Sequence, residues 1–106
     1  MLNHQAIDST LHALSAPTRR LIVERLSQGA ATVSELNAPL AISLAAVVQH
    51  LRILETAGII RSEKRGRIRR CHLRPQALSP LEQWITRRRR HWDRSLDRLA
   101  AALGEA

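Results

Sequence analysis

Aromatic residues and cysteine are scarce in this sequence. It has no phenylalanine, no tyrosine and two tryptophans among 106 residues, so any core must consist mainly of leucine, isoleucine, valine and alanine. An aliphatic, alanine-rich chain favours helices. The single cysteine cannot form an intrachain disulfide, which is typical of proteins in a reducing compartment.

Segments that would direct the chain to a membrane are missing as well. The first ten residues, MLNHQAIDST, have no charged start followed by an apolar run. No stretch approaches the roughly 18 consecutive apolar residues of a membrane span. The sequence therefore predicts a cytoplasmic protein without a signal peptide or a transmembrane helix.

Patterns that support catalysis or metal binding are absent. There is no glycine-rich phosphate loop, no serine or cysteine set beside a histidine and an acid, and no close pair of carboxylates. The histidines and Cys71 include no pair at the i, i+3 or i, i+4 spacing of helical metal ligands. We therefore expect neither an enzyme nor a cofactor or metal bound within one chain, while a metal site shared between two subunits stays open.

Positive charge, by contrast, is abundant. Seventeen Lys and Arg residues against nine Asp and Glu give a formal net charge of +8, and Lys64 is the only lysine. Such an excess indicates a polyanionic partner, because self-repulsion of this size does not help the chain to fold. Arginine makes forked bonds to phosphate and guanine, although a genome-wide arginine bias would give the same count.

Hydrophobic periodicity predicts five helices in one domain, residues 1–106. On the second helix Leu21, Ile22, Arg25 and Leu26 are expected to share one side. The helices are expected over residues 4–14, 17–29, 33–39, 43–58 and 79–104.

Capping residues and glycines fix where these elements begin and end. Thr32 and Glu35 form a capping box before the third helix, while Ser43 caps the fourth helix and Gly58 ends it. Gly66 marks a turn between two strands. The order predicts a mainly helical fold with a small β-hairpin, a winged helix-turn-helix with the helix-turn-helix at residues 32–57 and a two-stranded wing at residues 59–74.

The expected fourth helix has two different faces when its residues are placed at steps of about 100°. Its inner face, Leu44, Val47, Leu51 and Leu54, should pack in the core. Its outer face has the composition of a major-groove reader, because alanines allow close approach, glutamine can bond an adenine edge and arginine can reach a phosphate or guanine. The alternative is an ordinary solvated face. The residues expected to face base edges are Ala45, Ala46, Gln49 and Arg52.

The hairpin holds most of the positive charge. Residues 61–74 contain seven Lys and Arg against one acid, a balance of 7 − 1 = +6. Such a wing can follow a phosphate backbone, and Arg67 at its tip could enter a narrow A·T-rich minor groove. The expected wing contacts are Arg65, Arg67 and Arg69, and the expected phosphate contacts elsewhere are Thr32, Ser34, Ser43 and His50, with packing of His50 against the second helix as the alternative.

Cys71 lies in the second strand of the expected wing. Strand alternation puts it on the same face as Leu73, which favours a half-buried packing residue. Arg69, Arg70 and His72 would lower the pKa of its thiol if the sulfur were exposed. A redox sensor working through Cys71 therefore stays as an alternative.

The last helix carries a long apolar stripe that a domain of this size is not expected to cover with its own core. A twofold partner would bury it, and the alternative is that the stripe folds back onto the same chain. The residues expected in a homodimer interface, from the first and last helices, are Ile7, Leu11, Leu81, Trp84, Ile85, Trp92, Leu96 and Leu99.

Two stretches carry a resemblance to a known family. LHALSAPTRRLIVERLSQGAATVSEL and AVVQHLRILETAGIIRSEKRGRIRRCHL resemble the winged helix-turn-helix repressors of the ArsR family, over roughly residues 7–103. The resemblance implies a homodimer formed by the first and last helices, with two fourth helices in successive major grooves and the wings beside them. It also implies a repressor, commonly of its own operon.

The chain departs from the metal sensors of that family. TVSEL, residues 32–36, stands where those sensors carry a pair of cysteines, so thiolate sensing of arsenic or cadmium is not implied there. The histidine and acid pairs that other members place on the last helix are not matched in residues 81–103. The resemblance is therefore to members that lack the usual metal sites.

Three single positions also differ. Val48 stands where many members have a DNA-contacting serine, and Cys71 stands at a usual tyrosine position. Ala16 stands where an aspartate often caps the second helix, so either Ser15 takes over this cap or the helix start is weaker by about 1 kcal/mol. A second class of function stays open, in which the basic surface binds RNA or an acidic protein.

Overall fold

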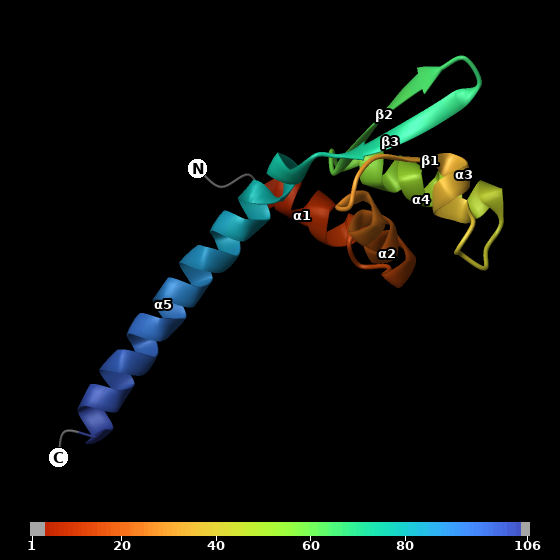
Figure 1. Cartoon of the computed structure of the whole chain (residues 1–106). Coiled ribbons are helices and arrows are strands. Elements are labelled where there is room, and N and C mark those ends of the chain that lie inside the picture. Colours follow the sequence, from red (N-terminus) through yellow and green to blue (C-terminus); the bar gives the residue numbers. More distant parts are fainter. Residues whose placement is uncertain (1–3, 105–106) are drawn as a thin grey trace.

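The computed structural model describes residues 4–104, which form five α-helices, a short 3₁₀ helix and a three-stranded antiparallel sheet (Figure 1). This confirms the expected mainly helical winged helix-turn-helix. The elements are α1 (His4–Ala13), α2 (Pro17–Leu26), β1 (Ala31–Thr32), α3 (Val33–Asn37), α4 (Leu44–Thr56), β2 (Ile60–Arg65), β3 (Ile68–Leu73), η1 (Pro75–Leu78) and α5 (Ser79–Gly104).

The caps of α3 and α4 lie where the sequence predicts them. Thr32 Oγ1 accepts a hydrogen bond from the Glu35 amide at 3.1 Å, and the Glu35 carboxylate accepts one from the Thr32 amide at 2.9 Å. The Thr32 amide also holds the pKa of Glu35 below its usual value. Ser43 caps α4 through the Ala46 amide, and Gly58, with φ +75°, follows its end in the left-handed conformation.

The start of α2 has no side-chain cap. Its N-cap is Ala16, and the hydroxyl of Ser15 instead donates to the His12 carbonyl at 2.7 Å. Of the two alternatives, the one in which Ser15 caps α2 is therefore wrong. Pro17, at the first helical position, presets the backbone angle that a helix needs there.

The sheet has the order β1-β3-β2, with both pairs antiparallel. Strands β2 and β3 pair from Ile60↔Leu73 to Arg65↔Ile68, and Gly66, with φ +63°, supplies the turn of the expected wing. Strand β1 is too short to show any periodicity, so it was not expected from the sequence. It pairs Ala31 with Cys71, which ties the start of the helix-turn-helix to the root of the wing.

The core lies between α2, α3, α4 and the root of the sheet. Two leucines do not lie as predicted: Leu44, expected in the core, and Leu21, expected to share one side of α2 with Ile22 and Leu26, are each 52% exposed. Leu44 is the first residue of α4, at the end away from the sheet, and Leu21 is turned off the α2 face formed by Arg19, Ile22 and Leu26. The largest fully buried side chains are Ile22, Val47, Leu51, Leu54, Ile59, Ile60 and Cys71.

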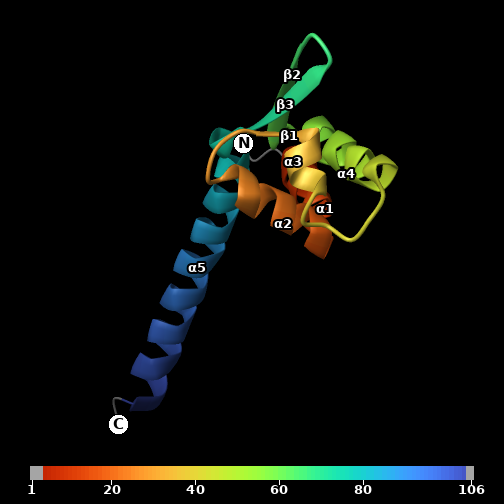
Figure 2. The same cartoon turned by 45° about the vertical axis from the view of Figure 1, so that its right-hand side comes forward.

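Helix α5 leads away from this body, on the side opposite to the wing tip (Figure 1, Figure 2). None of its described residues is buried, and the molecule measures 70 × 30 × 20 Å. Among the described residues, no helix combines the length and the apolar character that a membrane crossing requires.

Candidate nucleic-acid interface

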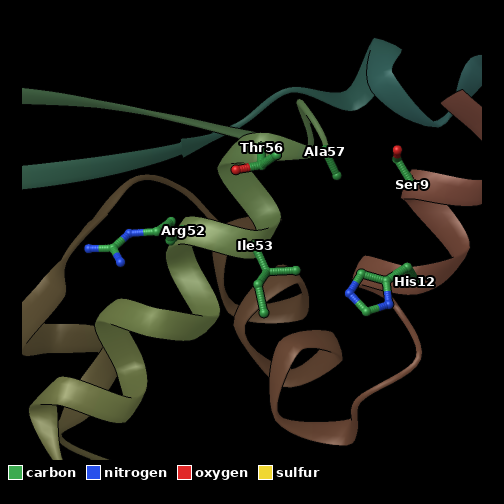
Figure 3. A pocket seen from close by; sticks show the side chains of 6 residues that line it. All are labelled: Ser9, His12, Arg52, Ile53, Thr56 and Ala57. Carbon is green, nitrogen blue, oxygen red and sulfur yellow. The ribbon is translucent and has the colours of Figure 1, made fainter. Parts of the chain in front are cut away.

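The outer face of α4 is exposed as the sequence predicts. Ala45, Gln49 and Arg52 are exposed, and Ala46 is half-buried at their margin. Arg52 also borders a groove of about 270 Å³ between α1 and α4, but its guanidinium points away from α1, whereas His12 and Ile53 lie toward the groove (Figure 3). The outer face of α4 is therefore accessible to a binding partner from solvent.

Side chains from the start of α3 and from the first half of β3 line a common groove. Thr32, Val33 and Ser34 line one side of a groove of about 310 Å³, and Arg67, Ile68 and Arg69 line the other. Thr32 and Ser43 accept hydrogen bonds from backbone amides, which leaves each hydroxyl proton free to be donated to an anion. The predicted phosphate contacts Thr32 and Ser34 and the predicted wing contacts Arg67 and Arg69 therefore line the same groove.

Arg65 and Arg67 extend from the wing tip. Both are exposed, and within residues 4–104 neither side chain forms a hydrogen bond or an ion pair. Their charges are therefore not neutralised inside the protein, which suits contacts with phosphate.

Arg69, the third predicted wing contact, is engaged inside the protein. Its guanidinium forms an ion pair with Glu55 at 2.7 Å and donates to Ser62 Oγ from two nitrogens, at 3.1 and 3.0 Å. Sequence reasoning missed Glu55 and Ser62. The signal was present, because strand alternation places Arg69 on the inward face with Cys71, and a cation there needs an acid.

His50 packs against α2, one of the two expected alternatives. Its Nδ1 lies 3.2 Å from Nη1 of Arg19, and because arginine only donates, Nδ1 is the acceptor. Burial, and then the charge of Arg19, lowers the pKa of His50. The proton is consequently on Nε2, where it can still be donated to a phosphate.

Arg19 itself was not predicted as an organising residue. It is 7% exposed, and it donates to the carbonyls of Ala13 at 2.7 Å and His12 at 3.1 Å. These carbonyls belong to the last turn of α1, so Arg19 joins the end of α1 to α2 and α4. The available signal was its spacing of three and seven residues from Ile22 and Leu26.

Cys71 is fully buried, more deeply than the half-buried position expected for it. Burial raises the pKa of its thiol, which the nearby charge of Arg69 only partly offsets. A buried thiol of raised pKa is inert toward oxidants. The redox alternative therefore gains no support from the geometry.

The predicted interface residues behave differently from one another. Ile7 is only 5% exposed, so it lies inside one protomer and not on a surface that a partner would reach. Leu11, Ile85, Trp92, Leu96 and Leu99 are exposed, and Leu81 and Trp84 are half-exposed. Within residues 4–104, no three His, Cys, Asp or Glu residues come close enough together to hold a metal ion.

Comparison with known sequences agrees with this architecture. Residues 16–62 match the family model described as "Bacterial regulatory protein, arsR family". An HTH-type transcriptional regulator of Mycobacterium tuberculosis is 38% identical over 96 residues, 91% of this chain and 87% of that protein. The HTH-type transcriptional repressor SmtB of the same organism is 40% identical over 62 residues, 58% of this chain and 46% of the repressor.

Solved structures show the same likeness. The crystal structure of an ArsR family transcriptional regulator has a TM-score of 0.82 and 35% identity, covering 86% of this chain and 94% of that one. An ArsR-like transcriptional regulator from Rhodococcus sp. RHA1 has a TM-score of 0.81 and 28% identity, covering 94% of each chain. The chain therefore belongs to the ArsR family, whose members are transcriptional regulators that bind double-stranded DNA and are not enzymes.

Proposed function

We propose that the protein is a homodimeric, cytoplasmic repressor that binds an imperfect palindrome in duplex DNA. The observation that carries this proposal is the exposed face of α4, with Gln49 and Arg52, together with a wing whose Arg65 and Arg67 form no ion pair with any residue from 4 to 104. Ala45, Ala46, Gln49 and Arg52 would face base edges, and Arg65 and Arg67 would follow the backbone.

The homodimer is supported by surface that one protomer leaves uncovered. On α5, Trp92 is 66% exposed, Leu96 52%, Leu99 53% and Leu103 71%, and these residues recur at spacings of three and four. The Cα radius of gyration is 18.9 Å, against about 13 Å for a compact chain of this length. A second copy would cover this stripe, and α5 can extend away from the body of its own protomer because the partner then supplies the packing.

The dimer sets the geometry of the operator. Because each α4 would occupy one major groove, the centres of the two half-sites should lie about 10 base pairs apart or a multiple of that. Thr32, Ser34 and Ser43 would donate to phosphates, and His50 would donate through Nε2. The resemblance that implies repression also favours the protein's own operon as its target.

Gln49→Ala and Arg67→Ala should weaken DNA binding in different ways. Gln49→Ala should relax the preference at one base pair by about 1–3 kcal/mol, because it removes a bidentate base contact. Arg67→Ala should weaken binding to all duplexes and lower the slope of log K against log salt by about one, because it removes one phosphate contact. Titrations with operator and scrambled duplexes at several salt concentrations measure both quantities. If the two variants changed preference and salt slope alike, this division of roles would be wrong.

Oxidation should not release the DNA. Because Cys71 is buried and its pKa is raised, brief exposure to dilute hydrogen peroxide should leave the affinity for the operator unchanged. Cys71→Ala supplies the control for any other oxidisable group. Release from the wild type but not from Cys71→Ala would instead establish the redox sensor.

A further inference from the structure

Arg69, Glu55 and Ser62 form a network where the wing leaves the body of the protein. Glu55 lies in the last turn of α4, Ser62 in β2 and Arg69 in β3. We propose that this network is a strut that fixes the wing relative to α4, with Arg69 as a positioning residue and not a phosphate contact. The part of this inference that concerns DNA rests on the proposed function.

The contacts are short and reciprocal. Ser62 Oγ donates to Glu55 Oε1 at 2.9 Å and accepts from Arg69 Nε and Nη2, while Arg69 Nη2 also reaches Glu55 Oε2 at 2.7 Å. Both oxygens of the carboxylate and the single hydroxyl are therefore used. An isolated ion pair with side chains 38% and 37% exposed would contribute little, but a charge-assisted pair closed by a third group has a defined geometry.

The network lies where it can fix the direction of the wing tip. Strand β1 ends at Thr32, opposite Arg70, so beyond this pair only two strands support the wing. Two strands without a core are marginally stable on their own. The network holds the hairpin at this point, and the turn with Arg67 lies beyond it (Figure 1). The angle at the root therefore sets where Arg65 and Arg67 lie relative to Gln49 on α4.

The charges distinguish a strut from a phosphate contact. If Arg69 contacted DNA, Glu55 would compete with phosphate for its guanidinium, and Glu55→Gln would strengthen binding. If the network is a strut, Glu55→Gln removes one negative charge from the protein and yet weakens binding to the operator, because the wing loses its fixed angle. The two roles predict opposite signs for the same substitution.

The experiment uses the full chain with Glu55→Gln, Arg69→Gln and the double variant, titrated with the operator duplex and with a scrambled duplex. We expect each single variant to bind the operator about tenfold more weakly, and the double variant to be no weaker than either, as coupled residues behave. Lys64→Gln is the matched control for Arg69→Gln, because both substitutions remove one positive charge from the hairpin. Lys64 is exposed and lies opposite Arg69 in the register of β2 and β3. The change in operator-binding free energy caused by Lys64→Gln should add to the change caused by Glu55→Gln when both substitutions are combined.

Residual dipolar couplings of backbone amides test the strut without DNA. In the wild type, the amides of residues 64–68 and of α4 should fit one common orientation. In Glu55→Gln and Arg69→Gln the couplings of residues 64–68 alone should shrink, while α4 keeps its values. Unchanged couplings in both variants, or tighter operator binding by Glu55→Gln, would overturn the strut. A wild type that fails to prefer the operator over the scrambled duplex would refute the proposed function, and the couplings would still decide the strut.

Discussion

A Trp92→Glu substitution should separate the subunits and leave each protomer folded. Trp92 is 66% exposed in the protomer, so the change removes little internal packing there. In the proposed dimer it would place a carboxylate in the middle of a buried apolar stripe, where an unpaired charge is costly. Sedimentation at micromolar concentration should then report a monomer, and affinity for the palindrome should fall by about 100-fold or more, because two linked half-site contacts become one.

Ala101→Glu is the matched control for this prediction. It adds the same charge to the same helix, nine residues further along, which places it on the opposite face of α5. Ala101 is exposed, and the variant should remain a dimer with nearly unchanged DNA affinity. A Trp92→Glu protein that stays dimeric, or two variants that dissociate equally, would show that the stripe of α5 is not the subunit interface.

An Arg19→Ala substitution should cause a large loss of folding stability. Arg19 is 7% exposed, and its guanidinium satisfies the His12 and Ala13 carbonyls and His50 Nδ1. Removing it leaves the buried Ala13 carbonyl and the part-buried His50 Nδ1 without this donor, while the His12 carbonyl keeps its bond from Ser15. The expected cost is about 2–4 kcal/mol, from roughly 1–3 kcal/mol for each group that loses its donor. That is a large part of the roughly 5–15 kcal/mol that stabilises an ordinary domain.

Urea unfolding at a fixed protein concentration measures this loss, because the stability of a dimer depends on concentration. Arg20→Ala is the control, since Arg20 also bonds a carbonyl, that of Leu14 at 2.8 Å, but is exposed. It should cost only a small fraction of the Arg19 value. Equal losses in the two variants would mean that the burial of Arg19 does not matter.

The local features of this fold could be predicted from the sequence because they depend on neighbouring residues. The capping box of Thr32 and Glu35, the cap at Ser43 and the glycines after α4 and in the wing turn are each decided within about four residues. The amphipathic face of α4 is decided in the same way, apart from Leu44, which periodicity places inward. Leu44 is exposed because the first turn of α4 extends past the hydrophobic core, and the periodicity of apolar residues does not show where the core ends.

Side-chain contacts between residues far apart in the chain could not be predicted from the sequence. The pair of Arg19 with His50 spans 31 positions, and that of Arg69 with Glu55 spans 14. A charge count treats Arg69 as a free cation, because it does not show which cations already have an acid. The apolar face of α1 predicts Ile7 at the subunit interface for a similar reason, since an apolar face on a short helix does not tell which neighbour covers it.

Selection of bound duplexes from a random pool, followed by sequencing, would show whether the protein binds a palindromic operator as a dimer. At about 150 mM salt, non-specific attraction to the phosphates is partly screened, so sequence preference becomes visible. We expect recovery of a twofold-symmetric motif with half-sites about 10 base pairs apart or a multiple. Tight binding with no recovered motif would contradict it, and would favour a basic surface that binds RNA or an acidic protein through charge alone.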